Sequence, residues 1–377
     1  MWYSKKMKIG IDTFGCMHGR SGLGSYLLSI LQNLPDLENV EYELFGPEMD
    51  RFTYQFENIN YNPLNIPDSI RAERFWHKRR SKKFFKKNNY SAVIYTAATK
   101  MLPKKFKIPG IAIVNDLVSN RIKNGDTWLQ KSVKKSLSKI DCIIASSQCV
   151  KDDLLKAGCK CHHIEVVYSG VDHSLFYPSQ SLSLTPEVLE IKPFAIKRPY
   201  IIYAAKMENA DKKHIELIKA FTLFKQKTSL PHRLVLAGAE GPFSDDVHKA
   251  VFSSPNASDI FLTGFFPHES FAELYRNADA CIVPCIDDGS GLSVLEALAT
   301  GVPLACSGKG AFKEVAKDGA LYFDSDNVEE IACAIEKIIT DTDLRQSLSK
   351  KALAISKDFS WEKCAKETIQ IIQKLQY

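Results

Sequence analysis

The sequence predicts an α/β protein with two domains. Its 377 residues exceed the length that one hydrophobic core usually organises. Short apolar runs with the character of buried strands lie at residues 7–12, 200–204 and 280–284, and stretches with helical periodicity follow them. With 45% hydrophobic and 25% charged residues, the composition is that of an ordinary globular chain.

The first strand, residues 7–12, leads into a segment that contains Gly19, Gly22 and Gly24, and a helical pattern follows over residues 25–31. The glycines predict a flexible turn at the carboxyl end of the strand. Because ligands of open α/β sheets bind at that end, we expect Gly22 and Gly24 to contact a substrate. A role in shaping the turn alone is the alternative.

The most informative segment runs from residue 280 to residue 303. A buried-strand pattern over residues 280–284 is followed by apolar residues at helical spacing from Leu292 until Gly301. The Gly-rich turn between them offers free N–H groups and the positive end of a helix, which suit a diphosphate. Glu296 is placed to accept two hydrogen bonds from a ribose diol, and Asp288 to contact the sugar beyond the phosphates. Asp288 as a helix N-cap is the alternative.

The same segment carries a family motif. It reads Asp288-Gly-Ser-Gly-Leu-Ser-Val-Leu-Glu-Ala-Leu-Ala-Thr-Gly-Val-Pro303, which is similar to E-G-F-G-L-P-x-L-E-A-M-A-x-G-x-P. Residues 274–280 and 319–324 flank it with further family patterns, and residues 166–178 and 201–221 continue them. In these motifs the chain resembles the retaining glycosyltransferases of the GT-B fold, family 4.

The resemblance implies the GT-B fold, in which two Rossmann-like α/β/α domains face a central cleft. We expect an acceptor-binding domain over residues 1–180, a nucleotide-sugar-binding domain over residues 195–358, and a helix over residues 359–377 that crosses back to the first domain. Composition agrees with a linker between Pro178 and Pro199, where Ser, Pro and Lys interrupt the periodic pattern.

The resemblance also implies the activity, which is transfer of a hexose from a nucleoside diphosphate sugar to an acceptor hydroxyl with retention. The acceptor would be a glycan or a lipid-linked oligosaccharide, and neither a cofactor nor a metal is expected. As catalytic residues we expect Lys206 and Lys212 on the phosphates, Asp288 on the sugar and Asp116 on the acceptor side. The expected donor-binding residues are Gly22, Gly24, Ser290, Gly291, Leu292 and Glu296, of which Gly22 and Gly24 would also line the acceptor side.

The chain departs from the family pattern at three of these places. Asp288 replaces a glutamate, Asn115 replaces a histidine, and Lys206 stands where an arginine is usual. The departures at Asp288 and Asn115 leave open a non-catalytic protein that binds nucleotide sugars. A nicotinamide-dependent oxidoreductase is disfavoured because residues 19–24 do not spell G-x-G-x-x-G.

Positive charge is concentrated in the first half of the chain. Residues 1–190 carry 27 Lys and Arg against 19 Asp and Glu, and residues 71–107 carry 13 basic residues against Glu73 alone. Aromatic residues at positions 75, 76, 84 and 85 are interleaved with the basic ones. Three interpretations remain open: a solvated helix, contact with an anionic membrane that carries a lipid-linked acceptor, and nucleic-acid binding. The last is the least favoured because the sequence contains no recognised nucleic-acid module.

The ten cysteines are scattered, and several lie inside apolar stretches, which indicates reduced core thiols rather than a disulfide framework. Cys159, Cys161, His162 and His163 do not have the spacing of a zinc site. The sequence contains neither a signal peptide nor an apolar run of membrane-spanning length. We therefore expect a cytoplasmic protein, either free or peripheral on the inner face of the membrane.

Overall fold

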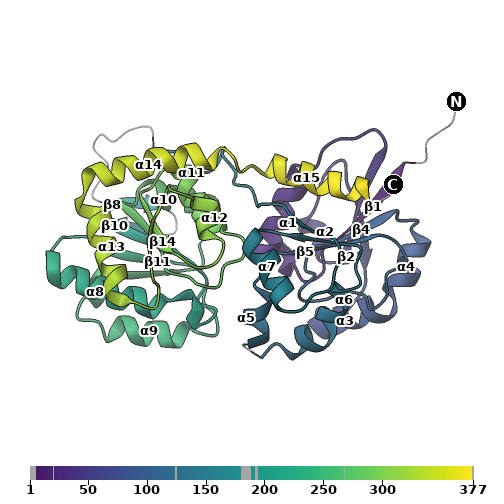
Figure 1. Ribbon diagram of the computed structural model, residues 1–377, viewed down its shortest axis with the longest axis horizontal. Helices are drawn as coiled ribbons and strands as arrows, with labels where there is room; N and C mark the ends of the chain where they lie inside the picture. The colour runs from purple at the N-terminus through teal and green to yellow at the C-terminus, as the bar shows by residue number, and fades with distance from the viewer. Residues whose placement is uncertain are drawn as a thin grey trace. The chain divides into compact units, whose positions relative to one another are not determined.

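The computed structural model describes residues 6–19, 21–123, 125–179, 188–191, 194–266 and 268–375. The chain forms two compact units (Figure 1). Unit 1 comprises Met1–Ser169 and Trp361–Tyr377, and unit 2 comprises Gly170–Ser360. The described cysteines are all free, and most of them are buried, which confirms the prediction of reduced core thiols.

The described part of unit 1 forms a seven-stranded parallel sheet in the order β3-β2-β1-β4-β5-β6-β7. Its strands are β1 (Met7–Asp12), β2 (Val40–Pro47), β3 (Asn60–Leu64), β4 (Ala92–Tyr95), β5 (Gly110–Val114), β6 (Cys142–Ala145) and β7 (Ile164–Val166). The longer helices are α1 (Gly22–Gln32), α3 (Ile70–Arg79), α4 (Ser81–Lys87), α7 (Gln148–Lys156) and α15 (Trp361–Lys374). Shorter helical segments are η1 (Met17–Gly19), α2 (Asp50–Thr53), α5 (Val118–Lys123), η2 (Leu129–Val133) and α6 (Lys134–Leu137).

The described part of unit 2 forms a six-stranded parallel sheet in the order β12-β11-β10-β13-β14-β15. Its strands are β10 (Tyr200–Ala204), β11 (Arg233–Ala237), β12 (Ile260–Gly264), β13 (Ala280–Val283), β14 (Leu304–Ser307) and β15 (Leu321–Phe323). The helices are η3 (Ala210–Lys212), α8 (His214–Thr228), α9 (Ser244–Phe252), η4 (Ala257–Asp259), α10 (His268–Arg276), α11 (Leu292–Thr300), α12 (Phe312–Ala316), α13 (Val328–Thr340) and α14 (Thr342–Ser356). An antiparallel hairpin of β8 (Val188–Ile191) and β9 (Phe194–Lys197) precedes the sheet.

In each sheet the chain reverses the direction in which strands are added. The first strand, β1 or β10, lies between the strand that follows it in the chain and a strand that comes three strands later, β4 or β13. At such a switch point the carboxyl ends of the two neighbouring strands lead to opposite sides, and open α/β sheets bind their ligands there. We therefore expect ligand-binding sites at the carboxyl ends of β1 and β4 in unit 1 and of β10 and β13 in unit 2.

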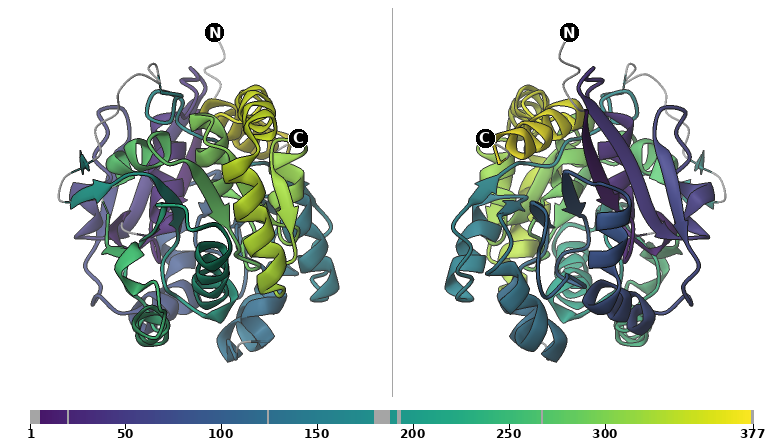
Figure 2. Two further views of the ribbon diagram at one scale, coloured as in Figure 1. Left: turned by 90° about the vertical axis from the view of Figure 1, so that its left-hand side faces the viewer. Right: turned by 90° about the vertical axis from the view of Figure 1, so that its right-hand side faces the viewer.

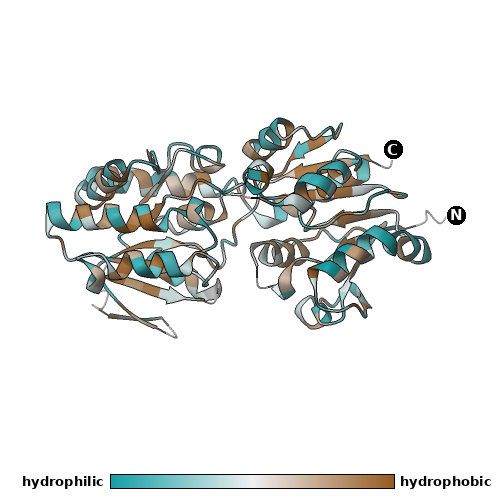
Figure 3. Ribbon diagram, turned by 90° about the horizontal axis from the view of Figure 1, so that it is seen from below, coloured by the Kyte–Doolittle hydropathy of each residue, from teal (hydrophilic) through white to brown (hydrophobic). Residues whose placement is uncertain are grey.

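Each sheet lies between helices that cover its two faces (Figures 1 and 2). In unit 2, α8 packs against α13 on one face and α10 packs against α11 on the other. The strands are mostly hydrophobic and the outer helix faces hydrophilic (Figure 3), as expected for parallel strands buried on both sides. In unit 1, the apolar stripe of α15 lies against α1, where Trp361 meets Tyr26 edge-on at 5.4 Å between ring centroids.

The chain passes from unit 1 to unit 2 between Ser169 and Gly170, earlier than the predicted linker after residue 178. The reason is packing, because Val171 and Phe176 are buried in the core of unit 2. Part of the predicted linker, residues 180–187, 192 and 193, lies outside the described residues.

The basic stretch over residues 71–107 folds as α3, α4 and the segment that leads through β4 to β5. Its interleaved aromatic residues mostly point inward: Trp76 and Phe85 are buried in the core of unit 1, and Phe84 is partly buried. Phe75 differs from them, since 54% of it is exposed. The aromatic pattern therefore reports core packing at three of its four positions.

Candidate active site

The loop between β13 and α11 lies at the switch point of unit 2. Its last residue, Gly291, has φ 68°, and α11 begins at Leu292. That backbone conformation favours glycine, and a Cβ atom would meet Val315 at 3.1 Å. The N–H groups at the start of a helix have no intrahelical acceptor. No other acceptor is described for those of Leu292 and Ser293, so they are free to bind an anion.

Asp288 is hydrogen-bonded to its own loop. Its Oδ1 accepts the N–H of Gly291 at 2.7 Å and the N–H of Ser290 at 2.9 Å. The structure therefore differs from the expectation that these two N–H groups face a diphosphate, because the nearest carboxylate occupies them. Asp288 thus closes the turn before α11 and is not the helix N-cap, which was the alternative for this residue, because the N-cap is Gly291 and no side chain caps the helix. Its contact with a sugar stays a prediction. In the described structure Oδ2 accepts no hydrogen bond.

Glu296 lies in the second turn of α11 and is partly exposed. Tyr275 of α10 is fully buried beside it. Burial and the neighbouring charge of Glu296 raise the pKa of Tyr275 well above its usual value, so the phenol stays protonated. No hydrogen-bond partner of the Tyr275 hydroxyl is described, and the contact of Glu296 with a ribose stays a prediction.

Lys212, the last residue of η3, reaches the same loop. Its Nζ donates to the carbonyl oxygen of Asp287 at 3.1 Å and to Sγ of Cys285 at 3.5 Å. Burial lowers the pKa of Lys212, but Cys285 and the carboxylates of Asp288 and Asp287 outweigh it, so the net pKa is raised and the ammonium stays charged. An ammonium has three N–H donors, and the third has no described partner. Lys212 is thus a fixed cation at the entrance to α11.

Lys206 follows β10 at the same switch point and is half-exposed. It forms an ion pair with Glu208. Exposed ion pairs contribute little to stability. A phosphate can therefore replace Glu208 as the partner of Lys206 at a small cost in free energy.

In unit 1, α1 begins at Gly22, three residues before the predicted helix, because Ser21 caps it by accepting the N–H of Gly24 at 3.1 Å. The two glycines differ. A Cβ atom at Gly24 would lie 2.6 Å from the carbonyl oxygen of Cys16 and from Cα of Gly19, so packing requires glycine there. Gly22 is exposed, with open space above it, which leaves its backbone accessible to a substrate.

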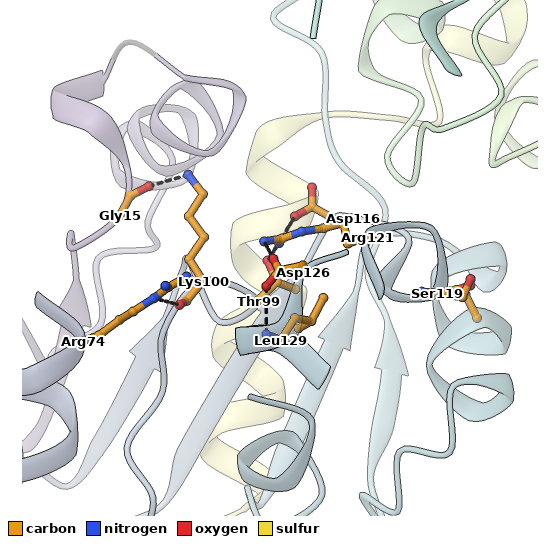
Figure 4. Close-up of polar contacts among 10 residues, drawn as sticks. Gly15, Arg74, Thr99, Lys100, Asp116, Ser119, Arg121, Asp126 and Leu129 are labelled. Atoms are coloured by element: carbon orange, nitrogen blue, oxygen red, sulfur yellow. Dashed lines mark hydrogen bonds and ion pairs between the residues drawn. The ribbon is translucent and has the colours of Figure 1, made fainter. Parts of the chain in front are cut away.

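Asp116 follows β5 and belongs to a polar cluster (Figure 4). Its Oδ2 accepts hydrogen bonds from Thr99 Oγ1 and from Arg121 Nη1, both at 3.0 Å. Its Oδ1 has no described partner, so one oxygen is left for a ligand. The preceding Asn115 has a buried Oδ1 without a described partner. Lys100, in the loop after β4, donates to the carbonyl oxygen of Gly15 at 2.8 Å and so ties the loops after β4 and β1 together.

Sequence reasoning missed a buried ion pair at the end of β1. Asp12 Oδ2 and His77 Nε2 are 2.6 Å apart, and His77 Nδ1 lies 2.8 Å from the carbonyl oxygen of Glu73. The carboxylate of Asp12 and the carbonyl oxygen of Glu73 are both hydrogen-bond acceptors. The imidazolium form of His77, which has an N–H group on each ring nitrogen, therefore donates to both. Burial lowers the pKa of His77, but Asp12 outweighs it and the net pKa is raised. Burial raises the pKa of the Glu73 side chain to about 7. Helical spacing could have placed Glu73, Trp76 and His77 on one buried face of α3, but it could not have identified Asp12 as the partner of His77.

The chain matches the sequence model described as glycosyl transferases group 1 over residues 186–354, which includes the β13–α11 loop. Residues 20–175 match the model described as glycosyltransferase family 4. The chain belongs to the GT-B glycosyltransferases of family 4. It is accordingly a transferase, and its fold is the α/β GT-B fold.

Two relatives illustrate the range of this family. The chain is 26% identical over 388 residues to the O-antigen chain mannosyltransferase B of Escherichia coli, and the match covers 98% of this chain and all of the relative. It is also 26% identical over 225 residues to the D-inositol 3-phosphate glycosyltransferase of a Nocardioides species. That second match covers 56% of this chain and 48% of the relative.

Solved structures agree with the fold. Sucrose-phosphate synthase from Thermosynechococcus elongatus has a TM-score of 0.76 at 17% identity, covering 98% of this chain and 99% of that one. HepE from Anabaena, in complex with UDP-glucose, has a TM-score of 0.75 at 16% identity, covering 98% and 100%. At such identities these structures bear on the fold alone. Among the helices of the described residues, none has both the length and the apolar composition of a membrane span.

Proposed function

We propose that this glycosyltransferase moves a hexose from a nucleoside diphosphate sugar to a hydroxyl of a glycan or lipid-linked acceptor, with retention at the anomeric carbon and without a metal. The donor class is supported by the structural similarity to HepE, which was solved with UDP-glucose. A role in surface-glycan synthesis is supported by the similarity to the O-antigen chain mannosyltransferase B, which matches along its whole length.

The observation that carries the proposal is the position of Lys212. Its ammonium is held against the loop that leads into α11, where the N–H groups of Leu292 and Ser293 are free. When the bond between the anomeric carbon and the phosphate oxygen breaks, negative charge accumulates on the leaving diphosphate. Fixed donors of this kind stabilise that charge more strongly in the transition state than in the ground state, which lowers the barrier.

The acceptor hydroxyl then forms the new bond to the anomeric carbon, on the face that the phosphate leaves. Its proton passes to an oxygen of the departing diphosphate, so no side-chain nucleophile is required. Asp116, with Oδ1 free, and the exposed backbone of Gly22 would contact the substrate from unit 1. Lys206 would exchange Glu208 for a phosphate oxygen.

A donor screen tests this proposal. Purified protein is incubated with a glycan acceptor and with UDP-, GDP- or dTDP-hexoses, and the released nucleoside diphosphate is measured with and without EDTA. We expect release from one nucleotide class, unaffected by EDTA, and an NMR spectrum of the product that shows the donor's anomeric configuration. Binding of a nucleoside diphosphate without release from any donor, loss of activity in EDTA, or an inverted product would each contradict the proposal.

The basic surface of unit 1 supports a second element of the proposal, which is peripheral contact with an anionic membrane. Each Lys or Arg near such a surface contributes roughly 1 kcal/mol. Vesicle sedimentation tests this. Binding to phosphatidylglycerol vesicles should weaken with salt, because charges are screened beyond about 10 Å at 0.1 M ionic strength. Equal binding to phosphatidylcholine vesicles would contradict it.

A further inference from the structure

Unit 1 contains a hollow between α4 and residues 105–108, the segment that leads into β5. Its volume is about 310 Å³. That is at the lower end of the range of roughly 300 to 1,000 Å³ typical of small-molecule sites. The hollow is separate from the residues that follow β1, β4 and β5 in the candidate active site, since it is lined by α4, the last residue of β4 and the segment before β5.

Four lysines line the hollow: Lys82 and Lys86, one turn apart on α4, and Lys105 and Lys107 on the facing segment. All four are exposed, and no carboxylate is described as a partner of any of them. Other lysines of the chain form ion pairs with carboxylates, for example Lys309 with Asp326 at 2.5 Å. The lysines of the hollow therefore present uncompensated positive charge.

The surface next to the hollow increases this charge. Lys104 precedes Lys105 and is fully exposed, and the nearby charge of Lys78 lowers its pKa. Arg79 and Lys135 contribute in the same direction. Repulsion among these cations is relieved when an anion binds between them. The net charge of this region thus favours a ligand with more than one negative charge.

The floor of the hollow is apolar. It consists of Phe85, Tyr95, Phe106 and Ile108. Tyr95 packs edge-on against Phe106 at 5.9 Å between ring centroids, and Phe106 and Ile108 are only partly buried. A ligand in the hollow would therefore meet ammonium groups at the rim and hydrocarbon below. A free inorganic anion would contact only the ammonium groups and not the apolar floor.

We propose that this hollow binds the phosphate headgroup of an anionic membrane lipid, with the first carbons of the lipid on the apolar floor. Lysine binds phosphate as a compact charge, and its methylene stem can cover apolar surface while the ammonium reaches outward. The volume admits a headgroup rather than whole acyl chains. The inference rests on the membrane contact proposed above and adds a defined site to it.

Two matched variants on α4 separate a site from diffuse attraction. Lys82→Gln/Lys86→Gln removes two cations that line the hollow, whereas Lys83→Gln/Lys87→Gln removes two exposed cations of the same helix that do not line it. Both change the net charge by the same amount. Binding of dihexanoylphosphatidic acid, kept below its micelle concentration, is measured by calorimetry. Wild type should bind one molecule saturably.

We expect the first variant to bind at least about tenfold more weakly, because each charge-assisted hydrogen bond that is lost contributes roughly 1.5 to 3 kcal/mol and 1.4 kcal/mol corresponds to tenfold. The second variant should stay within about twofold of wild type, since Lys83 and Lys87 do not line the hollow. An equal loss in both variants would overturn the site and leave only diffuse attraction. Inorganic diphosphate binding as tightly as the lipid would overturn the lipid assignment, as would equal binding of dihexanoylphosphatidylcholine.

A third variant tests the hollow without changing any charge. Ile108→Trp fills it, and circular dichroism and the melting temperature check that the protein is folded. If Ile108→Trp is folded, it should lose short-chain lipid binding but keep salt-dependent sedimentation with vesicles. Retained lipid binding in folded Ile108→Trp would overturn the proposal. If it does not fold, the α4 pair decides alone. Donor hydrolysis in solution should be unchanged in all variants, so failure of this site is distinguishable from failure of the proposed activity.

Discussion

Asp288→Ala tests whether the carboxylate that caps the α11 loop also serves the donor. The change removes the acceptor for the N–H groups of Ser290 and Gly291. Each intramolecular hydrogen bond of this kind contributes about 0.5 to 1.5 kcal/mol. In a unit of this size, 1 kcal/mol lowers the melting temperature by roughly 2 to 4 °C. We therefore expect Asp288→Ala to be measurably less stable as well as less active.

Asp288→Asn separates the two roles. Asparagine keeps an oxygen that can accept the same two N–H groups, but it lacks the charge that a sugar hydroxyl would meet at Oδ2. We expect the melting temperature to stay close to that of wild type, and turnover to fall sharply. Affinity for the free nucleoside diphosphate should stay within a few-fold, because that ligand lacks the hexose. Asp288→Glu restores the family residue, so it should keep activity and shift the preference among donor sugars.

Three measurements decide the outcome: thermal unfolding, calorimetry with the nucleoside diphosphate, and donor hydrolysis. Normal turnover by Asp288→Asn, together with a merely less stable Asp288→Ala, would show that the carboxylate is only a cap and that the sugar contact is wrong. A loss of diphosphate affinity beyond tenfold in Asp288→Asn would refute the division of roles between this residue and Glu296.

The remaining predictions concern three other places. Glu296→Ala should weaken nucleoside diphosphate binding at least tenfold in calorimetry, since charged hydrogen bonds contribute roughly 1.5 to 3 kcal/mol each; unchanged affinity would exclude the ribose contact. Gly24→Ala should lower the melting temperature because its Cβ would lie 2.6 Å from backbone atoms, whereas Gly22→Ala, with open space, should not; equal melting temperatures would contradict the packing argument. Burial lowers the pKa of His214 to about 4. Between pH 6.5 and 4 the unfolded chain therefore takes up a proton that the folded chain does not. His214 should therefore contribute a loss of about 2 kcal/mol of stability between pH 7 and pH 5, measured as the difference between wild type and His214→Asn in urea unfolding; an identical pH slope in the variant would contradict it.

Much of the fold could be predicted from the periodicity of hydrophobic residues and from the glycines that mark turns and helix ends. The strand β13, the Gly-rich turn and the helix α11 were all predicted, because a short apolar run, glycines and a helical pattern ended by Gly301 are local signals. The start of α1 was missed, since Gly22 and Gly24 suggest a turn and the cap from Ser21 outweighs their low helix propensity.

Features that depend on tertiary contacts could not be predicted in the same way. The pair of Asp12 and His77 joins residues 65 positions apart, and no local pattern reports such a contact. Likewise, the sequence could not show which of the adjacent rings is buried: Trp76 packs into the core whereas Phe75 faces solvent. For Asp288 the sequence offered a helix N-cap or a ligand contact, and the structure shows instead that it closes the turn by accepting hydrogen bonds from Ser290 and Gly291, while no side chain caps α11.

The order of the strands explains why the candidate residues fall where they do. Lys206 follows β10 and the loop of Asp288 follows β13, and these two strands are neighbours at the switch point of unit 2. In unit 1 the loop of Gly22 follows β1 and Lys100 follows β4, again at the switch point. The sequence indicates where each strand ends but not which strands are neighbours in the sheet. It therefore predicts these residues as candidates but not that they lie close together. Each pair becomes adjacent only when the first strand of its sheet pairs with the fourth. Pairing of β10 with β13 is therefore a condition for the phosphate contacts that we propose, and pairing of β1 with β4 is one for the loop contact of Lys100 with Gly15.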